Sequence, residues 1–75
     1  MRLIKDNTSV WETYMVEGYP LGIEKIDRGA WYAFRLFGQN RIYLMTEGVG
    51  KERAKALLAH ELKEYKSRIV VGQVA

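Results

Sequence analysis

The alternation of apolar and polar positions predicts an antiparallel β-meander in the first two thirds of the chain. Runs rich in β-branched and aromatic residues, separated by short turns, indicate strands over residues 10–16, 21–27, 30–37 and 41–46. Gly18 and Pro20 mark the first turn, and Gly38 opens a loop over residues 38–40 because glycine can adopt a positive φ. The last two strands are therefore expected to pair as a hairpin.

A helical period follows the strands. From Lys51 to Lys66 the apolar residues recur every three or four positions and form one stripe: Ala54, Leu57, Leu58, Leu62 and Tyr65. Gly50 suits the N-cap, and Glu52 suits the first turn. Beyond the helix, the β-branched run at residues 69–71 predicts a short last strand that pairs with an edge of the sheet.

These elements predict an α+β fold, an antiparallel meander of three to four strands with one C-terminal helix packed on one face. The 75 residues leave room for one small domain. We expect it to span residues 1–75, with a core over about residues 10–71 and frayed termini.

The period-two alternation of a strand divides the hairpin side chains between two faces. We expect the purely apolar face to lie under the helix; it collects Tyr32, Phe34, Leu36, Ile42 and Leu44. The opposite face is then open; it collects Trp31, Ala33, Arg35, Phe37, Arg41, Tyr43 and Met45. Because one helix covers only one face of a sheet, the second face is the predicted interaction surface.

Composition and motifs argue against most kinds of catalytic and metal-binding site. The chain has no cysteine and one histidine, His60, so no metal or cofactor is expected and no nucleophile–base set can form. The run Gly48-Val49-Gly50-Lys51 lacks the hydroxyl residue that a phosphate-binding loop needs after its lysine. We therefore expect a protein that is not an enzyme. No signal-like or membrane-spanning stretch occurs, which favours a cytoplasmic protein without a membrane partner.

The charge is unevenly placed along the chain. Residues 1–29 hold four basic and five acidic residues, whereas residues 30–75 hold eight basic and four acidic residues, within a net charge of +3. Arginines interleaved with aromatic rings can contact phosphates and stack on bases. The predicted surface for DNA or RNA comprises Trp31, Arg35, Arg41 and Tyr43, extended by Lys25 and Arg28. Alternatively, a protein partner, or a second copy of the chain in a homodimer, buries this same open face.

Residues 22–65 also resemble a family of DNA-binding domains. The segments Gly29-Ala30-Trp31-Tyr32-Ala33-Phe34-Arg35 and Gly38-Gln39-Asn40-Arg41-Ile42-Tyr43-Leu44, followed by Ala54, Ala56 and Leu57, are similar to the arm-site-binding domain of phage and transposon integrases. The plant ethylene-response-factor domain has a similar layout. The resemblance implies a three-stranded sheet laid into the major groove, with Trp31, Arg35, Arg41 and Tyr43 touching DNA. An accessory protein of a phage or mobile element is the corresponding expectation for the protein-binding alternative.

Overall fold

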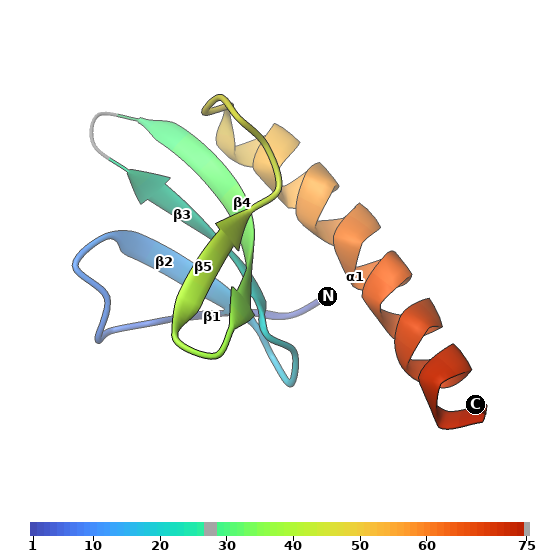
Figure 1. Cartoon of the computed structure of the whole chain (residues 1–75). Helices are drawn as coiled ribbons and strands as arrows, with labels where there is room; N and C mark the ends of the chain where they lie inside the picture. The colour runs from blue at the N-terminus through green and yellow to red at the C-terminus, as the bar shows by residue number, and fades with distance from the viewer. Residues whose placement is uncertain (27–28, 75) are drawn as a thin grey trace.

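The computed structural model describes residues 1–26 and 29–74, with side chains as far as Arg68. Five antiparallel strands form one meander sheet in the order β1-β2-β3-β4-β5, and one helix follows. The elements are β1 (Leu3–Lys5), β2 (Glu12–Val16), β3 (Leu21–Ile26), β4 (Ala30–Phe37), β5 (Asn40–Tyr43) and α1 (Lys51–Val74). The helix packs across β3 and β4 on one face of the sheet (Figure 1). The predicted α+β meander with one C-terminal helix is confirmed.

Three elements differ from the sequence prediction. The strand expected over residues 41–46 is shorter, because β5 ends at Tyr43. The sheet begins with β1, which the sequence analysis missed and which pairs Leu3 with Val16. The predicted last strand at residues 69–71 is wrong, because this segment continues α1. Each residue added to an existing helix gains a hydrogen bond, whereas a strand needs an edge to pair with. The end of α1 extends past the sheet, away from its edges (Figure 1).

The face of the sheet that meets α1 is the opposite of the predicted one. Trp31 is only 7% exposed and lies in the helix-side core. That core comprises Val16, Leu21, Ile23, Trp31, Ala33, Ala54, Leu58 and Leu62. Phe34 is also fully buried, but it lies on the other face, where its register partners are Gly22 and Tyr43. The expectation that Phe34 packs under the helix is therefore wrong.

The turn between β4 and β5 explains a second difference, namely that Arg41 and Tyr43 do not share a face with Trp31. The expected three-residue loop would pair Arg35 with Tyr43, so that both would share a face with Trp31. The observed turn has two residues, Gly38 and Gln39, and it pairs Phe37 with Asn40 and Arg35 with Ile42. A slip of one residue moves every side chain of a strand to the other face. Gly38 has a φ of +64°, as the tight turn requires.

The segment after β5 fixes Trp31 on the helix side. The backbone N–H of Trp31 donates to the Val49 carbonyl at 2.8 Å, and the Val49 N–H donates to the Trp31 carbonyl at 2.9 Å. Lys51, at the start of α1, places its Nζ 5.2 Å from the Trp31 ring and 5.1 Å from the Tyr14 ring. The indole is thus enclosed by the start of the helix and by a cation–π contact.

A glycine allows Phe34 to be buried on the face that has no helix. A Cβ at Gly22 would lie 2.9 Å from Cζ of Phe34 and 2.6 Å from the Tyr14 carbonyl oxygen, closer than atoms can approach. Without that Cβ, the phenyl ring rests directly on β3. The Arg41 guanidinium lies 5.1 Å from the ring centroid, and the Tyr43 ring packs edge-on at 6.2 Å. Phe34 is therefore covered by side chains of β5.

Leu58 tests the helix-side core. We expect Leu58→Ala to lower the free energy of unfolding by ~2–5 kcal/mol, because the side chain is fully buried in the middle of the stripe. Urea denaturation followed by circular dichroism measures the change. Leu57→Ala is the matched control: Leu57 is only partly buried, so the same deletion should cost less. Equal losses in the two variants would contradict the assigned helix orientation.

Candidate binding site on the open sheet face

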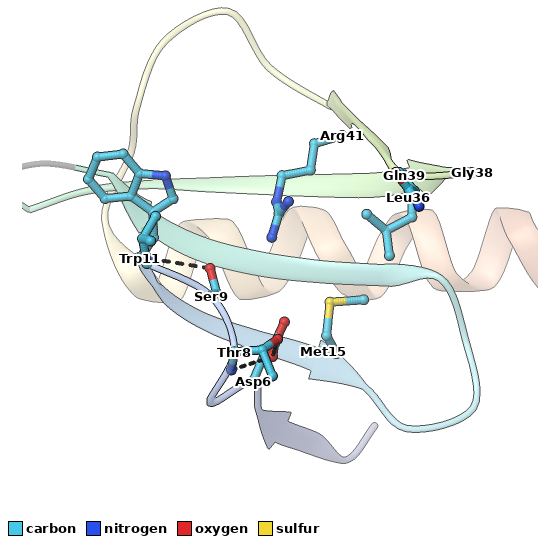
Figure 2. Close-up of a pocket in the computed structure, with 10 residues that line it drawn as sticks. Asp6, Thr8, Ser9, Trp11, Met15, Leu36, Gly38, Gln39 and Arg41 are labelled. Atoms are coloured by element: carbon cyan, nitrogen blue, oxygen red, sulfur yellow. Dashed lines mark hydrogen bonds between the residues drawn. The ribbon is translucent and has the colours of Figure 1, made fainter.

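The face of the sheet away from α1, here termed the open face, is formed by Thr13, Met15, Glu24, Phe34, Arg41 and Tyr43. A pocket of about 480 Å³ lies beside it, between the loop that joins β1 to β2 and the β4–β5 hairpin (Figure 2). Its walls are Asp6, Thr8, Ser9, Val10, Trp11, Met15, Leu36, Gly38, Gln39 and Arg41. Pockets of this size accommodate small organic ligands or one group of a larger ligand.

A buried carboxylate underlies this region. Glu24, on β3, is fully buried. Its Oε1 accepts hydrogen bonds from Thr13 Oγ1 at 3.0 Å and from Arg41 Nε at 3.1 Å, and its Oε2 accepts one from the Tyr43 hydroxyl at 2.6 Å. A carboxylate buried without partners would cost several kcal/mol, so these donors are what make the position tolerable.

The Glu24 carboxylate also orients Arg41. It binds the guanidinium through Nε, and within the part of the chain that the structure describes neither terminal nitrogen donates a hydrogen bond to the protein. The Arg41 side chain is 32% exposed and reaches from β5 toward the β1–β2 loop (Figure 2). A guanidinium held in this way presents its terminal N–H groups as a planar fork with a fixed direction.

The β1–β2 loop forms the opposite wall. Oδ1 of Asp6 accepts hydrogen bonds from the Thr8 hydroxyl at 2.6 Å and from the Thr8 N–H at 3.0 Å. The hydrogen bond from the Thr8 hydroxyl, and after it the one from the Thr8 N–H, holds the pKa of the Asp6 carboxyl below its usual value. The charge of Arg41 lowers this pKa by a smaller amount. Asp6 is thus an ionised acceptor at neutral pH. Trp11, with 39% of its surface exposed, lies at one end of the pocket (Figure 2).

The sequence-predicted site residues are divided between the two faces of the sheet. Trp31 is buried beneath α1, and Lys25 is its register partner on the same face. Arg35 pairs with Leu21 of the helix-side core. Only Arg41 and Tyr43 lie on the open face, and Arg28 lies outside the described residues. The expected surface that joins Trp31 and Arg35 to Arg41 and Tyr43 is therefore not formed.

The residues that sequence reasoning missed are Asp6, Trp11 and Glu24. An isolated acidic residue in a strand is ordinarily solvated, so Glu24 gave no sign of its burial. One signal was available: Thr13 and Glu24 share a strand face if β2 and β3 pair across the turn at residues 17–20. That pairing is observed, with Thr13 directly opposite Glu24.

No protein-family model, curated protein or solved structure matches this chain. Within residues 1–26 and 29–74, no three side chains of the metal-binding types come close enough to hold an ion. The helix in that part of the chain is not long and apolar enough to cross a bilayer. The chemistry of the pocket walls is consequently the basis for assigning a function.

Removing Arg41 should destabilise the fold. Arg41→Met leaves the Glu24 carboxylate buried without its cation, and we expect a loss of about 3–5 kcal/mol in the free energy of unfolding. Arg2→Met is the control, because Arg2 forms an exposed ion pair with Glu17 and should contribute at most about 1 kcal/mol. Urea denaturation of both variants measures the difference. Similar stabilities would show that Glu24 does not depend on Arg41.

The Tyr43 hydroxyl should lose its proton at a higher pH than an ordinary tyrosine. Burial, followed by the hydrogen bond to Glu24, raises the pKa of Tyr43 to about 12, above its usual value of 10.0. Since the folded-state pKa is raised, this group's stabilisation is complete below pH 10.0 and is lost as the pH rises through about 12. In a pH titration followed by tyrosinate absorbance, a step near pH 12 should appear, and Tyr43→Phe should remove it. Tyr14→Phe is the control and should retain that step, although a hydrogen bond to Glu12 also raises the pKa of Tyr14.

Proposed function

We propose that this protein is a non-enzymatic domain that binds single-stranded nucleic acid at the open-face pocket. One observation carries the proposal: the exposed indole of Trp11 and the oriented guanidinium of Arg41 line the same pocket of about 480 Å³. Aromatic rings on which bases stack, together with arginine, are the side chains that proteins use to hold unpaired bases. The volume is sufficient for one base.

The shape of the pocket favours a single strand over a duplex. Its two walls, the β1–β2 loop and the β4–β5 hairpin, flank the space between Trp11 and Arg41. A base inside a duplex is stacked on both sides and cannot enter such a space unless it is extruded. Like the integrase resemblance, the proposal has the protein bind nucleic acid. It replaces a sheet in the major groove of a duplex with a pocket for an unpaired base.

The charges around the pocket predict a weak dependence on salt. Arg41 is already paired with the buried Glu24 carboxylate, and Asp6 adds a negative charge to the opposite wall. Each phosphate contacted on a single strand contributes a slope of about −0.7 to log affinity against log salt. Since the walls carry no excess positive charge, we expect a slope of about −1 or shallower. Stacking, rather than counterion release, would then supply most of the affinity.

A second candidate function is supported by the apolar side chains near the pocket. Val10, in the pocket wall, is 91% exposed, and Ile4 lies on the exposed side of β1. Such groups also suit a protein partner or a second copy of the chain that covers the open face. Sedimentation at several protein concentrations distinguishes the cases, because self-association requires a concentration-dependent mass.

Trp11→Ala tests the proposed function. Loss of one stacked base costs about 1–3 kcal/mol, so affinity for a single-stranded oligonucleotide of mixed sequence should fall by about 5- to 150-fold. Fluorescence anisotropy of the labelled oligonucleotide at about 50 mM salt measures this change in affinity.

Phe37→Ala is the matched control for the loss of an exposed aromatic ring. Phe37 is 72% exposed at the hairpin and does not line the pocket, so this variant should bind as the wild type does. Thermal melts verify that both variants fold. Absence of binding by the wild-type protein, or equal losses in the two variants, would refute the proposed function.

A further inference from the structure

Resting on the proposed function, we infer that the open-face pocket selects guanine over the other bases. The pocket presents a donor fork on one wall, a carboxylate on the other and an aromatic ring at one end. These groups belong to Arg41, Asp6 and Trp11. Guanine is the base whose edges offer two neighbouring acceptors and two neighbouring donors at once.

The donor wall matches one edge of guanine. Guanine places N7 and O6 side by side as acceptors, and an arginine that donates to both is the commonest base-specific contact in proteins. Since Glu24 occupies Nε of Arg41, the terminal nitrogens remain for such a contact. Adenine presents an amino group in place of O6, and that group would face an N–H donor of Arg41.

The acceptor wall matches another edge of guanine. The N1–H and the 2-amino group of guanine are neighbouring donors, and an ionised carboxylate accepts from both. In Asp6, Oδ1 accepts the bonds from Thr8, and within the described part of the chain Oδ2 accepts none. The carboxylate is therefore held in place by its own loop while one oxygen stays available.

Selectivity depends on the two walls being fixed before the base arrives. Arg41 is oriented by the buried Glu24, which makes Glu24 a positioning residue, and Asp6 is oriented by Thr8. Stacking on Trp11 tolerates every base, because each base has an aromatic face. Trp11 thus contributes affinity, whereas Arg41 and Asp6 contribute the choice of base.

The test uses short oligothymidylates that differ at one central position. Guanine, adenine, inosine (which lacks the 2-amino group) and 7-deazaguanine (which lacks N7) are compared by fluorescence anisotropy with the wild-type protein. A well-formed bidentate contact discriminates by about 1–3 kcal/mol, so guanine should exceed adenine by about 5- to 150-fold in affinity. Inosine and 7-deazaguanine should each fall between them.

Asp6→Asn separates the acceptor wall from the donor wall. Asparagine can still accept a hydrogen bond from Thr8, but it replaces a carboxylate oxygen with an amide donor. The preference for guanine over inosine should disappear, while the preference for guanine over 7-deazaguanine, which depends on Arg41, should remain. Glu52→Gln removes the same charge from an exposed position on α1 and should leave all preferences unchanged.

Failure of the inference can be told apart from failure of the proposed function. If all the oligonucleotides bind with equal affinity, the pocket does not select guanine, although single-strand binding stands. An Asp6→Asn variant that retains the preference for guanine over inosine would also overturn the inference. If no oligonucleotide binds, the proposed function and the inference fall together.

Discussion

The buried Glu24 carboxylate is the constraint on which the shape of the sheet depends. Its hydrogen-bond donors come from β2 on one side and from β5 on the other, although β4 separates β5 from β3. In a flat sheet, β3 and β5 would lie about 10 Å apart. For Arg41 and Tyr43 to reach Glu24, the side chains of β5 must lean over β4 toward β3. The same arrangement covers Phe34 and aims Arg41 at the pocket.

The two faces of the sheet are consequently stabilised by different physical effects. On the helix side, Leu58, Leu62 and Trp31 form an apolar core that excludes water, which requires a matching stripe on α1 and little directional precision. On the open face, stability depends on hydrogen bonds with defined geometry around one charge, and Gly22 leaves room for the Phe34 ring beside them. A polar network of that kind orients side chains, which is the property that a binding site requires.

Sequence reasoning succeeded where short-range pattern decides the structure. The unbroken run at residues 30–37 forms β4, and the helix begins at Lys51 as its periodicity indicates. It failed where a single residue of register matters. The sequence around Gly38 is compatible with a loop of two or of three residues, and the two loops place Arg41 on opposite faces. The candidate site could not be predicted for the same reason: Asp6, Trp11 and Arg41 line one pocket only in the observed register.

The chain contains two tryptophans, and the fold places them in contrasting environments. Trp31 is enclosed between the sheet and α1, while Trp11 faces solvent at the pocket. Their fluorescence therefore reports on separate events. A dissolved quencher such as acrylamide reaches Trp11 in the native protein and reaches Trp31 only after the helix separates from the sheet. The molecule thus carries one intrinsic optical probe of the pocket wall and another of unfolding, with no label added.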